Sequence, residues 1–199
     1  MNNSALRLAL IALAACSADT RKAPEANSSK VVPGPSIADL AVPEKFPVAA
    51  HEVLASATEF EIFATHPYPN SREEGGLAEA ELLYGFSVLS QATVSDVAVR
   101  HDIVSVLYAG VEANKGMQGL CFLPRHAIRA RSGEQTVEVM ICFQCYSISV
   151  NQDGESLSVL IDRSAAAPLT KIWEDAGVTV HTAEYLDEDE GEIEPQSKR

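Results

Sequence analysis

The stretch from Cys121 to Cys145 constrains the fold of this chain more than any other part of the sequence. It is predicted to form two β-strands that fold back on each other around Ser132-Gly133-Glu134-Gln135, because the residues after this turn have a strong β-strand pattern. Three of the four cysteines, an arginine and a histidine lie at the end of the hairpin that is distant from the turn. If the chain carries a specific chemical site, we expect it at this end.

The first sixteen residues predict where the protein is located. Residues 8–15 are an unbroken apolar segment, which is too short for a membrane-spanning helix of about 20 residues and is typical of a secretory signal peptide. The segment ends in Leu13-Ala14-Ala15-Cys16, which resembles a bacterial lipobox. By that resemblance, residues 1–15 are a lipoprotein signal peptide, and Cys16 carries a diacylglycerol and an N-acyl chain such as palmitate. The alternative is an ordinary signal peptide that happens to end near a cysteine.

Composition divides the rest of the chain into three parts. Residues 16–50 contain five prolines among small and polar residues and show no sustained period, which predicts a Pro-rich tether. Residues 184–199 are strongly acidic and are predicted to be a disordered tail. A single domain is therefore expected at residues 51–183, held on the membrane by the lipid anchor. The formal net charge of −13 argues against a nucleic-acid partner.

The domain is predicted to contain strands and helices in the order β-β-α-β-β-β-α. Strands are expected at residues 57–64 and 82–93, before a helix that begins after Ser95 and ends at Asn114-Lys115-Gly116. The second strand of the central hairpin is predicted to continue to residue 150, and a turn at 151–154 leads to a strand at 157–161 and a helix at 165–176. This order favours an α+β fold, an antiparallel sheet with two helices packed on one face.

The cysteines allow three interpretations, and the first is a structural disulfide. With one cysteine used for the lipid, three remain outside the cytoplasm, so one disulfide and one free thiol are expected. A three-residue hairpin loop places Cys121 directly opposite Cys145. A two-residue loop places Cys121 opposite Tyr146, although a bulge at Pro124 would restore the match. The pair Cys121–Cys145 is preferred over Cys121–Cys142.

The second interpretation is a zinc site with Cys121, His126, Cys142 and Cys145 as its four tetrahedral ligands. Against it, Cys142 and Cys145 lie in a predicted strand, where residues three apart point to opposite faces. The third interpretation is a redox-active Cys142-Phe-Gln-Cys145 pair. Such a pair normally opens a helix, whose N-terminus stabilises the thiolate, and no helix is predicted here. These residues alone do not decide among the three.

Arg125, His126 and Cys142 form the candidate functional patch. Arg125 can bind an anion or a carboxylate, since its guanidinium offers two parallel N–H donors. It can also brace the sheet by bonding backbone carbonyls and a carboxylate such as Glu138, and this second role is the one we expect. The sequence contains no Ser-His-Asp, GxSxG, HExxH, P-loop or dinucleotide-binding pattern, so no catalytic residue is predicted.

Two short motifs of the hairpin resemble those of a known protein family. They are Cys121-Phe-Leu-Pro-Arg-His-Ala-Ile128 and Cys142-Phe-Gln-Cys145. The chain is similar to uncharacterised bacterial secreted and lipoprotein-like proteins, which pair C-F-x-P-R-H, followed by Gly or Ala and then Ile or Leu, with C-F-x-C. The likeness extends from about Phe60 to Val178, with Ala127 where glycine is commoner. The resemblance implies a shared fold, and the family brings no activity that can be transferred.

Together these features predict a membrane-anchored lipoprotein of the cell envelope that faces the periplasm or the cell exterior. We expect it to be a binding or accessory protein without catalysis and without a cofactor. The alternative is an envelope thiol or metal protein that acts through the cluster of Cys121, His126, Cys142 and Cys145, with zinc as its metal. The lipid anchor supplies the contact with the membrane, and the sequence specifies no protein partner or ligand.

Overall fold

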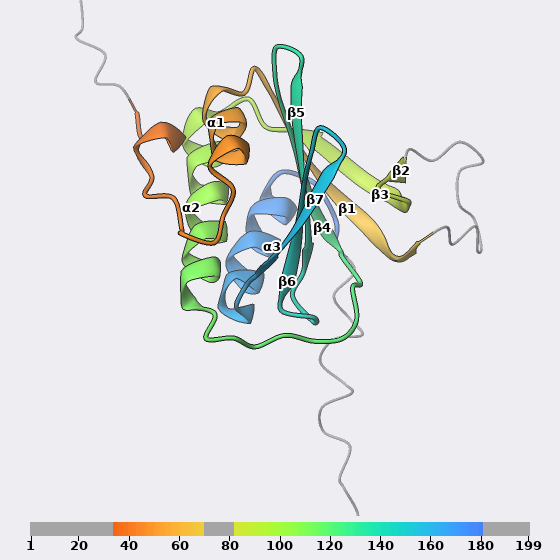
Figure 1. The fold of residues 1–199 in the computed structure, drawn as a ribbon. Helices are drawn as coiled ribbons and strands as arrows, with labels where there is room; N and C mark the ends of the chain where they lie inside the picture. The colour runs from red at the N-terminus through yellow and green to blue at the C-terminus, as the bar shows by residue number, and fades with distance from the viewer. Residues whose placement is uncertain (1–33, 70–81, 181–199) are drawn as a thin grey trace, which may run out of the picture. The chain divides into compact units, whose positions relative to one another are not determined.

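Seven antiparallel strands form one sheet in the order β2-β3-β1-β4-β5-β6-β7 (Figure 1). The computed structural model describes residues 34–69 and 82–180, so the predicted signal peptide, Cys16 and the acidic tail lie outside the described residues. The strands are β1 (Glu59–Pro69), β2 (Leu82–Leu83), β3 (Phe86–Thr93), β4 (His126–Ser132), β5 (Gln135–Cys142), β6 (Ser147–Gln152) and β7 (Glu155–Leu160). This architecture confirms the predicted α+β class with an antiparallel sheet.

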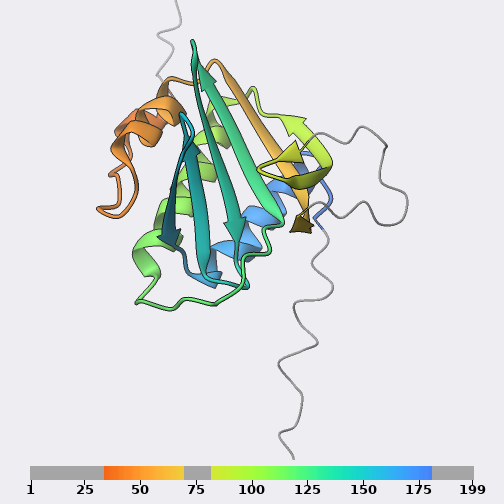
Figure 2. The same ribbon diagram turned by 45° about the vertical axis from the view of Figure 1, so that its right-hand side comes forward.

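Within the described residues, three α-helices and two short 3₁₀ helices accompany the sheet. The α-helices are α1 (Val48–Ser56), α2 (Val97–Ala113) and α3 (Ala166–Asp175), and the 3₁₀ helices are η1 (Ile37–Asp39) and η2 (Arg163–Ala165). Figure 2 shows the twist of the sheet, with the strands spread between the edge strands β2 and β7. The sequence analysis predicted α2 and α3 and missed α1.

Apolar side chains form two buried clusters. The larger cluster combines residues of all three α-helices with alternate residues of the strands, such as Ile128. The smaller cluster contains the neighbouring Ala127 together with Phe63 and Met140, since consecutive strand residues point to opposite faces. Trp173 of α3 is fully buried, and its indole N–H donates to the Phe63 carbonyl at 2.9 Å. This bond ties the helix directly to β1, an interior strand of the sheet.

The domain begins earlier in the chain than residue 51. Ile37 and Phe46, which the sequence analysis assigned to the tether, are almost fully buried. The Phe46 ring packs on Tyr108 of α2 with ring centroids 4.9 Å apart. The tether boundary at residue 50 was therefore wrong, because prolines interrupt the periodicity of this segment without preventing its apolar residues from packing.

Two strand boundaries also differ from the prediction. Residues Tyr84 and Gly85 both have positive φ and form a tight turn between β2 and β3, so the predicted strand at 82–93 is a hairpin. The first strand, predicted to end at residue 64, continues to Pro69. Prolines are tolerated there because β4 pairs with β1 only as far as Ala64, which leaves the last residues of β1 without that neighbour.

The turn after α2 and the turn between β6 and β7 agree with the sequence analysis. Gly116 and Gly154 both have positive φ, and Asp153 before Gly154 completes the two-residue turn. The N-cap of α2 is Asp96 rather than Ser95, and its carboxylate accepts the Ala98 N–H at 2.8 Å.

Candidate functional site at the base of the β4–β5 hairpin

The β4–β5 hairpin closes through a two-residue turn. Ser132 pairs with Gln135, and Gly133 between them has a positive φ of 60°. A glycine in this conformation at the first turn position is typical of a type II′ hairpin turn. The three-residue loop, which would have placed Cys121 opposite Cys145 in the ladder, was therefore wrong. The paired strands end at His126, so Cys121 precedes β4 and is not part of the ladder.

The segment Cys142-Phe-Gln-Cys145 is a chain reversal and not a strand. β5 ends at Cys142, which pairs with Ser147 at the start of β6, and Tyr146 adopts a positive φ of 53°. The predicted continuous strand to Val150 was therefore wrong. The sequence hides this reversal because its four residues include no glycine or proline, and a tyrosine takes the left-handed conformation that usually favours glycine. The Cys-x-x-Cys spacing was the one signal for a turn.

A disulfide joins Cys121 to Cys145, with Cα atoms 5.6 Å apart. This is the pair that the sequence analysis preferred, although irregular backbone and not strand register brings it together. The Gly119 N–H donates to the Cys145 carbonyl at 2.9 Å, and a Cβ atom on Gly119 would lie 3.0 Å from Cys145 Cα. Closing a loop of this length stabilises the fold by about 3 kcal/mol in a chain-entropy estimate.

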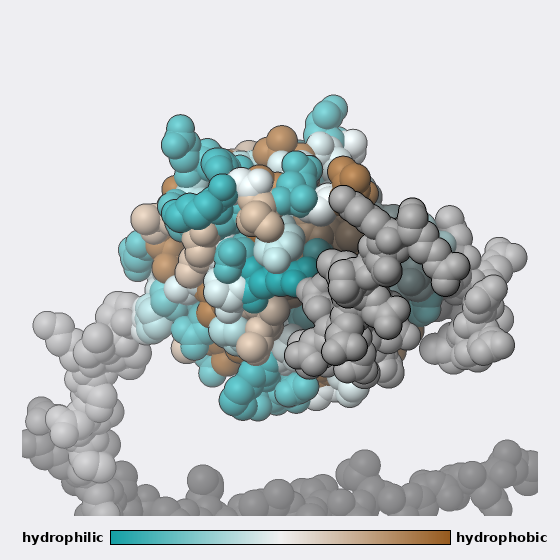
Figure 3. Space-filling model, turned by 90° about the horizontal axis from the view of Figure 1, so that it is seen from below, coloured by the Kyte–Doolittle hydropathy of each residue, from teal (hydrophilic) through white to brown (hydrophobic). Residues whose placement is uncertain are grey.

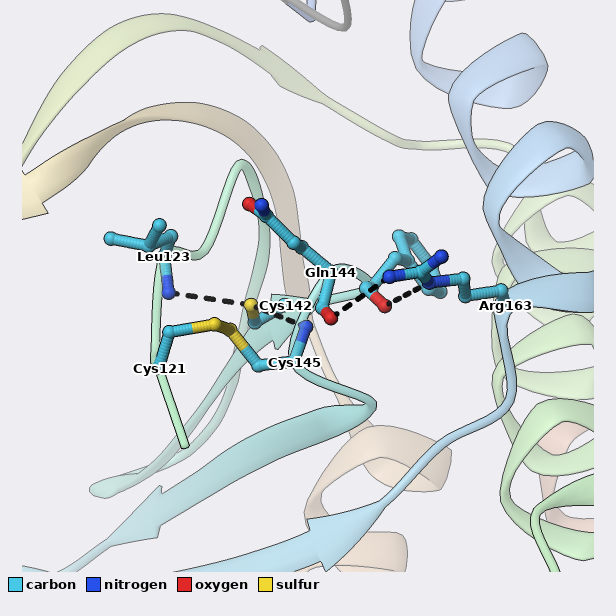
Figure 4. Close-up of a disulfide and its surroundings, with 7 residues drawn as sticks. Cys121, Leu123, Cys142, Gln144, Cys145 and Arg163 are labelled. Atoms are coloured by element: carbon cyan, nitrogen blue, oxygen red, sulfur yellow. Dashed lines mark hydrogen bonds between the residues drawn. A yellow bond between two sulfur atoms is a disulfide. The ribbon is translucent and has the colours of Figure 1, made fainter. Parts of the chain in front are cut away.

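The third cysteine, Cys142, is a buried free thiol beside this disulfide (Figure 4). The sulfur of Cys142 accepts the Leu123 N–H at 3.3 Å and the Cys145 N–H at 3.2 Å. Burial raises the pKa of the Cys142 thiol, whereas these amides and the charge of Arg125 act in the opposite direction. The sulfur atoms of Cys121, Cys142 and Cys145 all lie within 4.8 Å of one another.

His126 does not join the three sulfur atoms. Its Nε2 lies 2.9 Å from the Thr170 hydroxyl of α3, and its ring contacts Phe143 and Trp173 edge-on. Burial lowers the pKa of His126 to about 3, and the nearby charge of Arg125 acts in the same direction. The imidazole is therefore neutral at physiological pH. The four-ligand zinc site is wrong in its fourth ligand, since only the three sulfurs come together among the described residues.

Arg125 does not brace the sheet through Glu138. The partner of Glu138 is Arg129, whose Nε lies 2.7 Å from a carboxylate oxygen in the neighbouring strand. These two residues face each other directly across the β4–β5 ladder, whereas Arg125 lies just before β4. The Arg125 side chain is mostly buried and lines a pocket together with His126. The structure thus brings two of the three patch residues to one cavity and places Cys142 with the disulfide.

This pocket has a volume of about 450 Å³ and lies between the hairpin base, η2 and α3. Its apolar lining includes Ile141 and Phe143, and its charged lining consists of three basic residues and one acidic residue. The residues around it are Arg125, His126, Ile141, Phe143, Gln144, Arg163, Ala166, Ala167, Thr170, Lys171 and Glu174. The face seen in Figure 3 likewise mixes hydrophilic and hydrophobic residues.

Arg163, the first residue of η2, binds the chain reversal that follows β5. Its Nε donates to the Phe143 carbonyl at 3.2 Å and its Nη2 to the Gln144 carbonyl at 3.1 Å, as Figure 4 shows. Its guanidinium also lies over the ring of Tyr146 at 4.5 Å from the centroid. The sequence analysis did not identify Arg163, Thr170 or Lys171 as site residues. They belong to a separate segment, and no local pattern indicates that this segment faces the hairpin.

Comparison with known proteins finds no family model, no curated protein and no solved structure that matches the chain. Within residues 34–69 and 82–180, no helix has both the length and the apolar character that crossing a membrane requires.

Proposed function

We propose that the protein is a non-catalytic binding protein of the bacterial cell envelope and that its pocket binds a small amphiphilic anion. The observation that carries this proposal is the composition of the pocket, whose lining combines apolar residues with basic groups. Its volume of about 450 Å³ lies within the range of roughly 300–1,000 Å³ that is usual for small-molecule sites. A molecule with a short hydrocarbon part and one carboxylate matches this lining.

The charge distribution supports an anionic ligand. The whole chain has a formal net charge of −13, yet Arg125, Arg163 and Lys171 outnumber Glu174 around the pocket. Concave sites with one prevailing sign of charge concentrate ligands of the opposite sign. His126 adds a neutral imidazole, so it can accept or donate a hydrogen bond without adding charge.

Anchoring through Cys16 is the second part of the proposal. The lipobox-like Leu13-Ala14-Ala15-Cys16 and the similarity to secreted and lipoprotein-like proteins support it. Two or three acyl chains bind a membrane stably where one chain does not. Such an anchor would confine the binding domain to the membrane surface, where amphiphilic anions accumulate.

Binding can be measured with decanoate as the probe, because Trp173 is the only tryptophan of the chain and its ring lies 5.5 Å from that of His126. We expect a saturable change in Trp173 fluorescence with decanoate and at least tenfold weaker binding of the uncharged decanol. Filling the pocket by Ala167→Phe should weaken decanoate binding about tenfold, which corresponds to about 1.4 kcal/mol.

The matched control is Ala109→Phe, which adds the same ring at an exposed position of α2 away from the pocket. This variant should bind decanoate like the unchanged protein. Equal affinity for decanoate and decanol would contradict the anionic site. Equal weakening by both phenylalanine variants would show that binding occurs elsewhere.

The anchor has its own test. Changing Cys16→Ser removes the sulfur that forms the thioether, so cells fed labelled palmitate should incorporate the label into the unchanged protein only. The variant should also leave the membrane fraction. Incorporation of equal label into both proteins would refute lipidation at Cys16 and would leave the pocket proposal untouched.

A further inference from the structure

We propose that the three sulfur atoms at the hairpin base form a thiol–disulfide exchange site, independent of the anion pocket. In this site Cys142 attacks Cys145, and Cys121 is released as an exposed nucleophilic thiol. The substrate class of that thiol is a disulfide of another protein. The proposal rests on four features of the cluster: the proximity of the sulfurs, the hydrogen bonds to Cys142, the unequal exposure of the cysteines and the short span of the turn.

The sulfurs are close enough for direct exchange. Each of the three sulfur atoms lies within 4.8 Å of the other two, and Figure 4 shows Cys142 next to the disulfide. The chain reversal of residues 143–146 produces this arrangement, because a continued strand would have directed Cys142 and Cys145 to opposite faces. A third thiol held against a disulfide is positioned for attack without a large movement of the backbone.

Burial raises the pKa of the Cys142 thiol and so disfavours its thiolate, and the contacts around the sulfur oppose this effect in part. Thiol–disulfide exchange proceeds through the thiolate. The two N–H groups that point at the Cys142 sulfur, from Leu123 and Cys145, stabilise a negative charge on it. Arg125 contributes a positive charge nearby and opposes the effect of burial.

Exposure decides which sulfur is attacked. Cys121 is exposed, whereas Cys142 and Cys145 are buried. Attack on Cys145 expels Cys121, whose thiolate is stabilised by water. Attack on Cys121 would instead expel Cys145 as a buried thiolate at a high desolvation cost. The favoured product is therefore a Cys142–Cys145 disulfide within the turn and a free thiol at Cys121.

The exchange is balanced without an external oxidant or reductant. The Cys142 thiol first loses its proton, and its sulfur then supplies the electron pair for the new Cys142–Cys145 bond. The Cys121–Cys145 bond breaks, its electron pair leaves on the Cys121 sulfur, and that thiolate takes up a proton from water. In a second step the Cys121 thiolate attacks a partner disulfide, which gives a mixed disulfide and releases one partner thiolate.

The folded protein holds the Cys121–Cys145 isomer as its resting state, with Cys142 as the free thiol. The Cys121–Cys145 bond spans a sequence separation of 24, and the new bond would span only three residues. The exposed thiol is thus a minor species, which a trapping reagent can collect.

Trapping with iodoacetamide tests the proposal on the full chain carrying Cys16→Ser, which removes the remaining thiol. The native protein is incubated with excess reagent, quenched in acid, and mapped by peptide mass without reduction. We expect the label on Cys121 and a disulfide between Cys142 and Cys145. The companion variant Cys142→Ser should keep the Cys121–Cys145 bond and show at least tenfold less label at Cys121.

Denatured protein provides the reference. A chain unfolded at neutral pH in guanidinium chloride that already contains the excess reagent should carry the label on Cys142 alone, because Cys142 is the free thiol of the resting isomer. Label on Cys142 in the native protein would mean that the buried thiol becomes accessible to the reagent without any exchange of disulfides. That result would overturn the proposal. Absence of label on the native protein would overturn it as well. Circular dichroism of Cys142→Ser verifies that the comparison is made between folded proteins.

Discussion

At the scale of single residues, the ionisation of His126 is linked to folding. The folded protein encloses it between two aromatic rings, and burial lowers the pKa of His126 to about 3. An unfolded chain has an ordinary histidine with a pKa of about 6.5. Between these two values the unfolded state binds a proton that the folded state does not. The stability contributed by the neutral ring is therefore present above pH 6.5 and is lost as the pH falls toward 3.

We expect the free energy of unfolding to fall by about 2 kcal/mol from pH 7 to pH 5 through His126 alone. Urea unfolding at both pH values, compared between the unchanged protein and His126→Gln, isolates this contribution from that of the carboxylates. His101→Gln, at a partly exposed position of α2, is the matched control. If the pH dependence of His126→Gln equalled that of the unchanged protein, the neutral buried imidazole would be refuted.

At the scale of elements, α2 packs against η2 through a glycine. A Cβ atom on Gly110 would lie 2.7 Å from Ala165 Cβ and 2.8 Å from Ile161 Cγ1. The Gly110 carbonyl also accepts the Asp162 N–H at 2.9 Å. The close approach of α2 to this segment therefore depends on the absence of a side chain.

The variant Gly110→Ala separates packing from helix propensity. Propensity alone predicts a gain of about 1 kcal/mol for alanine in a helix, whereas the clashes predict a loss of about 1–3 kcal/mol. We expect the loss, measured as a lower urea midpoint with an unchanged slope. The neighbouring exposed Ala109→Gly serves as the control and should lose about 1 kcal/mol from propensity. A higher midpoint for Gly110→Ala would contradict the packing.

The elements also show what could be predicted from the sequence. Turns with glycine at the required position, such as Gly133 and Gly154, were located correctly because local chemistry determines them. The reversal at Cys142–Cys145 was missed because tertiary contacts hold Tyr146 in an unfavourable conformation. The alternation of apolar and polar residues along a strand indicates which of its faces is buried. It does not indicate which distant helix covers that face, and for this reason the α3 side of the pocket could not be predicted.

At the scale of the whole molecule, the domain depends on residues that precede α1. Ile37 and Phe46 are buried in the larger cluster, and Ala50 of α1 is fully buried. Removal of a buried phenylalanine side chain typically costs about 3–5 kcal/mol. The functional unit must therefore include this segment, and any Pro-rich tether must lie before it.

Two shortened chains test this boundary. A chain of residues 34–183 should unfold with nearly the urea midpoint of the full chain, because it retains every buried residue named above. A chain of residues 51–183 should lose several kcal/mol, since it lacks Phe46 and its contact with Tyr108. Phe46→Ala in the full chain should reproduce most of that loss. Equal midpoints for the two shortened chains would restore the boundary at residue 50.

The connectivity of the sheet has a consequence for the order in which the protein assembles. Strands β4 to β7 follow one another through short turns, so their pairing closes only small loops. Pairing of β1 with β4 instead joins residues such as Phe63 and Ala127, which are more than sixty positions apart. Because closing longer loops costs more entropy, local pairing precedes distant pairing during folding. We therefore expect β4 to β7 to pair first, so that the turn holding Cys142 and Cys145 is formed before β1 and the helices dock.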